Sequence, residues 1–501
     1  MSYGLRYVPA FSQALKDNIE RTYTYSYAKN ALNYIGEPSG YSPYVAFEDV
    51  LTREPFEAFM ALERHNYKAT LNALNRYHVP YTSEQERKAR IKHEVIEEMC
   101  KERSDTVFLY IDQHDLEGTG IINIGKQGTY ELTTAETILV SNFINKLNTN
   151  HLTSNVFYKE KVKQQLSKAQ EKVVKGCLTH KYSCLIGGAG TGKSHVTSAI
   201  VDQLKANDKS VAILAPTHKA REALQSKLTE GAGDVRTIHS YVHSNTGHDV
   251  DAVIVDEAGM ISTPLMLMLI RAYKSGQQLI FVGDKNQLEP IEYGRPFELL
   301  MKRLKVYELT ENWRSESGDI ISLGQELLGR TVNKNIEMKN IQVVDSITEA
   351  FEQGAEVLLT FTNANVALAN EQQKLKDAPK TIAEGFSVGD KIIAKTNKAP
   401  QFFNGQLFVI TSYDTAKNIA TEEEIKFKTW QDLKFNFDLA YGLTIHKSQG
   451  SEWGAVAYMP SEWDTQNLAY VAVTRAKEKL IIVGSIPDSS TLRPPKEWRH
   501  Y

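Results

Sequence analysis

GGAGTGKS, residues 187–194, is the stretch that decides the fold. It follows the apolar run 184–186, which has the composition of a buried strand, and it precedes residues 196–204, whose apolar side chains recur at helical spacing. A glycine-rich turn between a strand and a helix is typical of a phosphate-binding loop, because its backbone N–H groups can surround a phosphate. Lys193 would then reach the β- and γ-phosphates, and Ser194 would hold Mg²⁺. The residues expected to bind the nucleotide are Gly187, Gly188, Ala189, Gly190, Thr191, Gly192, Lys193 and Ser194.

Two further segments predict that the bound nucleotide is hydrolysed. VIVDEAG, residues 253–259, places Asp256 and Glu257 directly after an apolar strand. The first carboxylate can hold Mg²⁺ through water, and the second can polarise the attacking water. GDKNQLEP, residues 283–290, follows another apolar strand, and its Gln287 is placed to sense the γ-phosphate. The sequence therefore predicts hydrolysis of the bound nucleotide, with Mg²⁺ as the metal required.

The composition describes an ordinary globular chain. With 501 residues it predicts about three to four domains. No apolar run approaches the length of a membrane span and the N-terminus has no apolar signal core, so we expect a cytoplasmic protein without a membrane partner. The three cysteines show no metal-ligand spacing and are expected to be reduced. A net charge of −3 excludes a globally basic nucleic-acid binder but allows a local basic groove.

Apolar strands alternate with helices on both sides of residue 350. This alternation predicts an α/β fold in which parallel sheets are covered on both faces, in two nucleotide-binding-type domains. Within the second of these domains, residues 385–438 carry short strands and turn residues, which predict an inserted small β-barrel. A lysine-rich helix is expected at 159–174. The expected strands are 211–215, 252–255, 278–282, 455–458 and 480–483, with a further one after 357.

Residues 1–150 are expected to form a separate α+β domain. The segment RTYTYSY, residues 21–27, alternates aromatic and polar side chains, which fits a half-exposed strand or a surface on which bases stack. One capping box starts a helix at residue 83, and a second, Thr133 with Glu136, starts a helix that runs through residue 147. We assign no chemistry to this domain.

The order of the motifs resembles the superfamily 1 helicases, and most of all their RecD-like and Dda-like branch, superfamily 1B. LSKAQ, residues 166–170, resembles the Q motif, which implies that Gln170 contacts the adenine. LTENWRS, residues 309–315, resembles motif IV, and AYVAVTRAKEKL, residues 469–480, resembles motif VI. These two motifs would supply arginine fingers that stabilise charge on the transferred phosphoryl group. The implied catalytic residues are Lys193, Glu257, Gln287, Arg314 and Arg475.

The same resemblance implies contacts with single-stranded DNA on both domains. The first domain carries APTHKAR at 215–221 and TIHS at 237–240, and the second carries FTNAN at 361–365 and AYGLTIHKSQGSEW at 440–453. The side chains expected at the strand are mostly neutral and polar, so they suit phosphates and sugars and not base edges. We expect no sequence specificity. The implied DNA-binding residues are Pro216, Thr217, His218, His239, Asn363, Thr444 and His446, of which His239 and His446 could instead be structural.

The resemblance implies two RecA-like parallel-sheet lobes, an SH3-like insertion that contains NGQLFVI, and an N-terminal α+β accessory domain. The expected bounds are 1–150 for the accessory domain, 156–300 for lobe 1, 301–380 with 437–501 for lobe 2, and 381–436 for the insertion. The implied activity is that of a monomeric ATP-dependent DNA helicase that moves 5′ to 3′ on single strands and opens ss/ds junctions. Replication or recombination proteins are the expected partners of the N-terminal domain. The resemblance also suggests that the protein comes from a phage and is located in the host cytoplasm.

Three alternatives stay open at this point. A translocase could remodel protein–DNA complexes with little unwinding, since the segment 241–251, where relatives carry a strand-separating pin, is short. A nucleotide-gated binding or scaffold module could retain the motifs without a motor. An RNA strand could replace DNA, because nothing in the motifs contacts a 2′-hydroxyl. The direction of movement is open as well.

Overall fold

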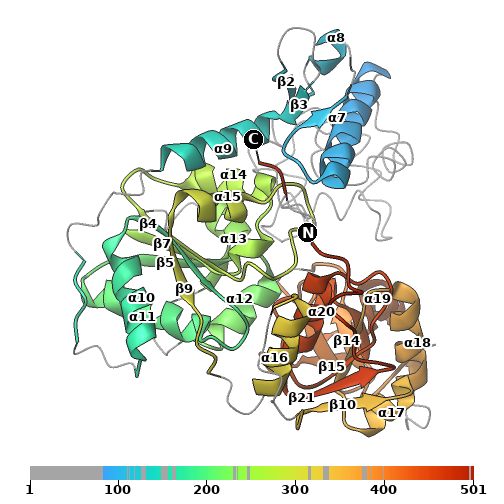
Figure 1. The fold of residues 1–501 in the computed structure, drawn as a ribbon. Coiled ribbons are helices and arrows are strands. Elements are labelled where there is room, and N and C mark those ends of the chain that lie inside the picture. The colour runs from blue at the N-terminus through green and yellow to red at the C-terminus, as the bar shows by residue number, and fades with distance from the viewer. Residues whose placement is uncertain are drawn as a thin grey trace.

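The computed structural model describes residues 83–500 except 110, 112, 118, 126–130, 148–155, 161–164, 229–232, 234, 245–248, 314–317, 331–337, 375–380, 384, 399 and 496–497. Residues 21–27, Arg314 and the centre of the predicted pin segment lie outside the described residues. Figure 1 shows two α/β lobes, one green to yellow and one orange to red, with an N-terminal unit beside the first.

Lobe 1 is built on a six-stranded sheet of order β6-β5-β7-β8-β4-β9, in which every strand pair is parallel. The central strands are almost wholly apolar because helices cover both faces. Neighbouring residues point to opposite faces, so Ile213 and Leu214 belong to separate buried clusters. The strands are β4 (Tyr182–Gly187), β5 (Val211–Ala215), β6 (Val235–Thr237), β7 (Ala252–Val255), β8 (Gln278–Gly283) and β9 (Lys305–Leu309).

The helices of lobe 1 divide between these two faces. Buried side chains of α10, α11 and α12 pack in the cluster that contains Ile213, and those of α13, α14 and α15 pack in the cluster that contains Leu214. The helices are α10 (Lys168–Thr179), α11 (Lys193–Ala206), α12 (His218–Gln225), α13 (Ile238–His243), α14 (Thr263–Ala272) and α15 (Pro296–Arg303), with the short η1 (Ala258–Met260) after β7.

Two element boundaries differ from the prediction. Strand β9 pairs with β4, so the first sheet extends to Leu309 and the domain boundary expected at residue 300 falls before its last strand. The lysine-rich helix expected from residue 159 begins only at Lys168, since Ser167 caps it by accepting a hydrogen bond from the Gln170 N–H. Charge composition predicted the helix, but the capping residue decides where it starts.

Lobe 2 contains a five-stranded parallel sheet of order β10-β21-β20-β11-β19. The predicted α/β class with two parallel-sheet lobes is therefore confirmed. Its strands are β10 (Ile341–Val344), β11 (Val357–Thr360), β19 (Gly442–Thr444), β20 (Trp453–Tyr458) and β21 (Ala476–Val483). Its helices are α16 (Gly318–Leu327), α17 (Ile347–Glu352), α18 (Asn363–Gln373) and α20 (Gln466–Thr474), with the short η2 (His446–Ser448) after β19.

A five-stranded antiparallel sheet, order β17-β16-β15-β14-β18, occupies the segment between α18 and β19. Phenylalanines fill its core, among them Phe402, Phe408 and Phe437. The SH3-like assignment of this insertion stays a prediction. Its elements are β12 (Thr381–Ala383), β13 (Phe386–Ser387), β14 (Lys391–Ala394), β15 (Leu407–Ile410), β16 (Thr415–Asn418), β17 (Glu424–Lys426), α19 (Trp430–Asn436) and β18 (Phe437–Leu439).

The N-terminal unit has a three-stranded antiparallel sheet of order β1-β3-β2. Its last helix, α9, is capped by Thr134 and not by the predicted Thr133, which lies in β3 and donates to the Asp105 carbonyl. Val140 and Ile144 of α9 pack in the core of lobe 1. The unit therefore shares a core with that lobe. Its elements are α7 (Ser83–Glu102), β1 (Val107–Phe108), α8 (Gln113–Leu116), β2 (Ile121–Asn123), β3 (Glu131–Thr134) and α9 (Ala135–Lys146).

The C-terminal segment returns from lobe 2 to this unit (Figure 1). The buried Trp498 indole donates to Asp105 at 2.7 Å, and Arg499 forms a parallel β-bridge with Ser104. His500 lies between the carboxylates of Asp105 and Glu298, at 3.4 and 3.5 Å. The segment thus contacts both the N-terminal unit and lobe 1. Among the described helices, none has the length and hydrophobicity to cross a bilayer.

Candidate active site

The phosphate loop lies at the carboxyl end of β4, and Lys193 is the first residue of α11. Gly190 and Gly192 have φ angles of 76° and 80°, which side chains rarely adopt. The Lys193 ammonium donates to the Gly187 and Gly188 carbonyls, at 2.7 and 3.0 Å. The lysine therefore closes the loop on itself, and a phosphate would take the place of these carbonyls as its partner.

Asp256 and Glu257 follow the end of β7, as the sequence predicts. Burial and the neighbouring Glu257 carboxylate raise the pKa of Asp256 to about 7. Burial and Glu257 outweigh the opposing effect of Lys193 and Lys227, so a cation beside this carboxylate is a good fit. Ser194 and Asp256 line the same cavity and supply the oxygen ligands that Mg²⁺ prefers.

A cavity of about 400 Å³ joins the two lobes at this point. Lys193, Glu257 and Gln287 line it from lobe 1, and Arg475 lines it from lobe 2. Four of the five predicted catalytic residues are thus brought together, and the fifth, Arg314, lies outside the described residues. Other lining residues are Gly188, Ala189, Gly190, Thr191, Gly192, Ser194, Trp313, Gly450, Glu452 and Lys477.

Arg475 is held at the end of α20 by backbone oxygens. Its Nε donates to the Val471 carbonyl and its Nη1 to the Ser451 carbonyl, both at 3.2 Å. The side chain is only 5% exposed. A buried guanidinium fixed by carbonyls keeps its direction, which suits a group that acts on phosphate.

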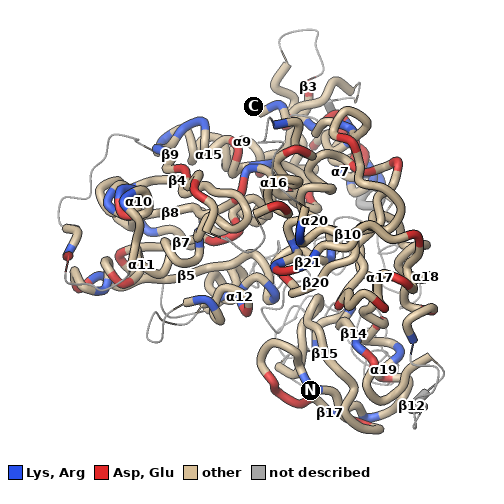
Figure 2. The backbone as a smooth tube through the Cα atoms, turned by 60° about the horizontal axis from the view of Figure 1, so that its bottom comes forward, with Lys and Arg blue, Asp and Glu red and all other residues tan. Residues whose placement is uncertain are grey.

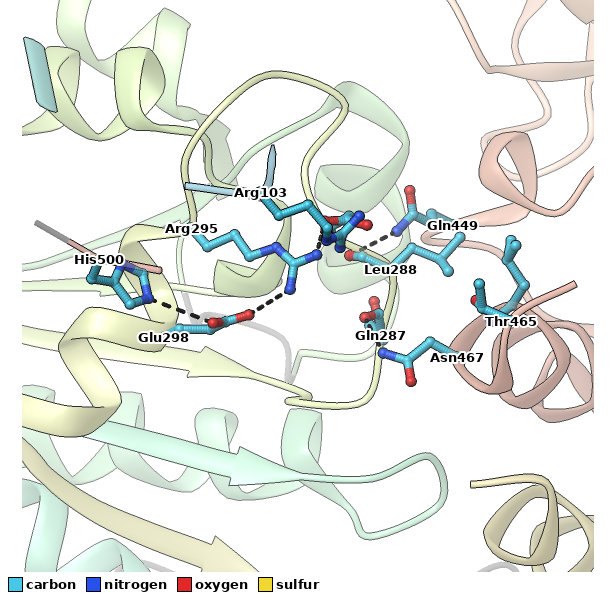
Figure 3. Close-up of polar contacts among 11 residues, drawn as sticks. Arg103, Gln287, Leu288, Arg295, Glu298, Gln449, Thr465, Asn467 and His500 are labelled. Atoms are coloured by element: carbon cyan, nitrogen blue, oxygen red, sulfur yellow. Dashed lines mark hydrogen bonds and ion pairs between the residues drawn. The ribbon is translucent and has the colours of Figure 1, made fainter. Parts of the chain in front are cut away.

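Gln287 lies where the segment after β8 meets lobe 2 (Figure 3). Its carbonyl accepts from the Asn467 amide at 3.5 Å, and the next carbonyl, that of Leu288, accepts from Gln449 at 3.4 Å. Figure 3 also shows Arg103 and Arg295 with Glu298 and His500 on the other side of this segment. The segment carrying Gln287 is therefore fixed between lobe 2 and the N-terminal unit.

Gln170 lies beside the phosphate loop but serves as a helix cap. Its side-chain oxygen accepts from the Ser167 N–H at 3.1 Å, and the residue is 4% exposed. Its amide nitrogen would lie 2.8 Å from a Cβ at Gly192. A contact with adenine, as the Q motif implies, requires the amide oxygen to leave the cap or the amide nitrogen to donate to the base.

The predicted DNA-binding residues gather at the carboxyl ends of the parallel strands in both lobes. Thr217 follows β5, His239 follows β6, Asn363 follows β11 and Thr444 ends β19. Ligands of parallel α/β sheets bind at this edge. Asn363 and His446 are exposed and Thr444 is half-buried. Figure 2 shows basic and acidic residues interspersed along the described backbone of both lobes.

His218 is buried beneath the insertion. Its ring stacks on Phe403, with centroids 3.6 Å apart and planes 6° apart. Burial, with Arg221 and His239 adding to it, lowers the pKa of His218 to about 3. Pro216 and His239 are buried too. Contact between His218 and a nucleic acid would require Phe403 to move.

Two contacts between the lobes were missed by sequence reasoning. The Lys219 ammonium donates to the Lys447 carbonyl at 2.7 Å, and Lys227 pairs with Glu452 at 3.1 Å. Burial and the Arg475 guanidinium lower the pKa of Lys219 to about 7. Lys219 stands within the quoted APTHKAR motif, but only the fold reveals its partner. Together these contacts join the two lobes beside the cavity.

Known proteins resemble both lobes. Residues 165–346 match a family described as an AAA domain, and residues 439–483 match the UvrD-like helicase C-terminal domain. The ATP-dependent RecD2 DNA helicase of Deinococcus radiodurans is 29% identical over 360 residues, which cover 65% of this chain and 50% of that protein. The RecBCD enzyme subunit RecD of Mycobacterium tuberculosis is 25% identical over 400 residues, 63% of this chain and 69% of that protein.

The chain spans about half the length of the RecD2 relative. A crystal structure of Bacteroides Pif1 bound to ssDNA aligns with 66% of this chain and 95% of its own, at 16% identity and a TM-score of 0.47.

Proposed function

We propose that this chain, a relative of the RecD-like superfamily 1 helicases, couples ATP hydrolysis to movement along single-stranded DNA and unwinds duplex in the 5′ to 3′ direction. The observation that carries the proposal is the cavity between two parallel-sheet lobes, in which Lys193, Glu257 and Gln287 of one lobe meet Arg475 of the other. A nucleotide bound there touches both lobes, so its hydrolysis can change how the lobes sit together.

Each residue has a defined part in the proposed reaction. The loop N–H groups and Lys193 hold the β- and γ-phosphates, and Glu257 orients the attacking water and accepts its proton. Ser194 and Asp256 would hold Mg²⁺, which would neutralise charge at the phosphate oxygens. Arg475, joined by Arg314 as the motif implies, stabilises the charge that develops on the transferred phosphoryl group.

Movement follows from contacts on both lobes. Thr217, on lobe 1, and Asn363 and Thr444, on lobe 2, lie near the carboxyl ends of their strands, and in this proposal they contact the sugar–phosphate backbone. Closing of the cleft changes the spacing between these contacts. Nucleotide binding favours the closed arrangement of the lobes over the open one. Alternating grip on the two lobes then advances the strand.

Lys193→Ala tests the motor. The variant loses the ammonium group that now donates to the Gly187 and Gly188 carbonyls and would donate to the phosphates of a bound nucleotide, so DNA-stimulated ATP turnover should fall by a factor of about 10² or more. Lys205→Ala, at the far end of the same helix, is the matched control and should turn over ATP normally. Turnover that survives Lys193→Ala would favour the nucleotide-gated module over the motor.

Duplexes with a 5′ tail, a 3′ tail or a fork test the direction and the product. We expect strand release from the 5′-tailed and forked substrates only. ATP turnover without strand release would indicate a translocase that does not unwind duplex. Strand release from the 3′-tailed duplex would indicate movement in the 3′ to 5′ direction. Equal stimulation of ATP turnover by matched RNA and DNA strands would remove the preference for DNA.

A further inference from the structure

One tyrosine of lobe 2 joins two loops of lobe 1 across the nucleotide cleft. Tyr470 lies on α20 and has no exposed surface. Its hydroxyl accepts a hydrogen bond from the Ala189 N–H of the phosphate loop at 3.0 Å. The same hydroxyl donates to the Asp284 carboxylate at 2.9 Å. One oxygen therefore connects the phosphate loop, the segment that leads to Gln287, and the second lobe.

The surroundings of this hydroxyl are closely fitted. Asp284 is 3% exposed, and its other oxygen accepts from the Asn286 N–H at 2.9 Å. A Cβ added at Gly188 would lie 3.1 Å from the Tyr470 oxygen. Gly188 does not have a positive φ, so the missing side chain is explained by this approach and not by the backbone. Burial and the Asp284 carboxylate raise the pKa of Tyr470, so the hydroxyl keeps the proton that it donates.

Tyr470 also belongs to the helix that presents Arg475. The Tyr470 carbonyl accepts from the Thr474 hydroxyl at 2.7 Å, and Arg475 is the C-cap residue of the same helix. Hydrogen bonds thus connect the phosphate loop and Asp284, through Tyr470, to the helix that ends at Arg475. The arginine, which contacts the cavity, would move with it.

A second buried pair shows what a purely structural tyrosine looks like in this lobe. The Tyr458 hydroxyl donates to Asp464 at 2.6 Å, and both residues belong to lobe 2. This bond stabilises one lobe and spans no cleft. The Tyr470 bonds differ because each of them ends in the other lobe.

We propose that Tyr470 is a positioning residue that couples the phosphate loop and the Asp284 segment to the helix carrying Arg475, and so ties closure of the lobes to the state of the nucleotide site. The inference rests on the proposed function for its consequence in ATP turnover. Its structural part, that the hydroxyl holds the lobes together, can be measured without turnover.

Tyr470→Phe removes the hydroxyl and keeps the ring in the core. Spin labels on Lys302→Cys of α15 and Glu352→Cys of α17, in a Cys100→Ser background, report the distance between the lobes. The nucleotide-free distribution should shift to longer distances and broaden in Tyr470→Phe. It should stay unchanged in Tyr458→Phe, the matched control. A Tyr470→Phe distribution equal to that of the unsubstituted protein would overturn the proposal.

Steady-state kinetics distinguish a positioning role of Tyr470 from a role in nucleotide binding. Tyr470→Phe should lower kcat for DNA-stimulated ATP hydrolysis by about tenfold and change KM for ATP by less than about twofold, because Lys193 and the loop amides remain. Nucleotide binding can be followed separately through Trp313, which lines the cavity. An unchanged kcat, or an increase in KM with no change in kcat, contradicts the proposal.

Gly188→Ala provides a second variant that keeps the tyrosine and displaces its hydroxyl. Because both changes act on one contact, the losses in kcat of Gly188→Ala and Tyr470→Phe should be less than additive in the double variant. Additive losses would count against the contact. If the unsubstituted protein hydrolyses no ATP with any strand, the proposed function fails while the distance measurement still decides the role of Tyr470.

Discussion

Glu257 has a φ angle of 51°, in the left-handed region that residues other than glycine rarely adopt. Such a conformation costs about 1–3 kcal/mol and persists where the surrounding structure imposes it. Here the strain turns the chain from β7 into η1 and directs Glu257 into the cavity that Lys193 and Arg475 share. Backbone geometry thus supports the role that the motif implies.

Glu257→Gln keeps the size of the side chain and removes its proton acceptor. We expect ATP and single-stranded DNA to bind as before while ATP turnover falls by about 10²–10⁴, the usual contribution of a general base. Glu422→Gln is the matched control, because Glu422 is another glutamate with positive φ, at 62°, and it lies exposed in the insertion. Single-turnover hydrolysis is the measurement, and a rate within twofold of normal would remove Glu257 from the water-activating role.

The chemical residues of the site were predictable, whereas their neighbours were not. Lys193, Asp256 and Gln287 each follow a strand within a short motif, so local spacing is enough to find them. The contact of Tyr470 with Ala189 joins residues 281 positions apart, and the stack of His218 on Phe403 joins an expected lobe to an expected insertion. A single sequence does not encode such pairings in any local pattern.

At the scale of elements, α12 and the insertion form one interface. Phe403 covers His218, and the Gln406 amide donates to Glu222 of the same helix. The pKa of His218 is about 3 in the folded chain and about 6.5 in the unfolded chain. Between about pH 3 and 6.5, the imidazole is therefore neutral in the folded chain and protonated in the unfolded chain. The contribution of His218 to stability therefore falls as the pH falls through that window.

Phe403→Ala should expose the ring of His218 and return its pKa toward the ordinary histidine value of about 6.5. An NMR titration of the imidazole measures the change. Phe403→Leu, which keeps an apolar cover, should leave the pKa well below that value. A low pKa in Phe403→Ala would mean that other groups bury the histidine. If removal of the cover also strengthens binding to single-stranded DNA, the insertion controls access to His218.

Strand order lies beyond what the elements alone can predict. Alternating apolar strands and helices were enough to predict two parallel sheets, and both are present. The place of β9 in the first sheet was not predicted, because its half-exposed sequence KVYEL fits an edge strand of either lobe. Only its pairing with β4 decides between them.

At the scale of the whole molecule, the C-terminal segment is anchored by a titratable group. Burial alone would lower the pKa of His500, but the carboxylates of Asp105 and Glu298 raise it above the ordinary value. A histidine with a raised pKa stabilises the fold fully below the unfolded value of about 6.5, and this contribution is lost as the pH rises through the raised pKa. The anchor should therefore weaken on the alkaline side of neutrality.

His500→Gln should flatten that dependence. Amide hydrogen exchange in α7 and β1 should speed up as the pH rises from about 6 to 9 in the unsubstituted protein, after correction for the intrinsic rate, and should be fast throughout in the variant. Exchange in α11, at the phosphate loop, serves as the internal reference. A corrected rate in α7 that is independent of pH in both proteins would show that His500 carries no anchoring charge.

The same segment has a mechanical consequence for lobe 2. The chain leaves lobe 1 after Leu309 and enters α16 at Gly318, and it returns between Arg493, which pairs with Thr465, and Trp498, which contacts Asp105. Lobe 2 is therefore connected to the rest of the protein on both sides along the chain, and the reach of these two connections limits how far Arg475 can move away from the phosphate loop.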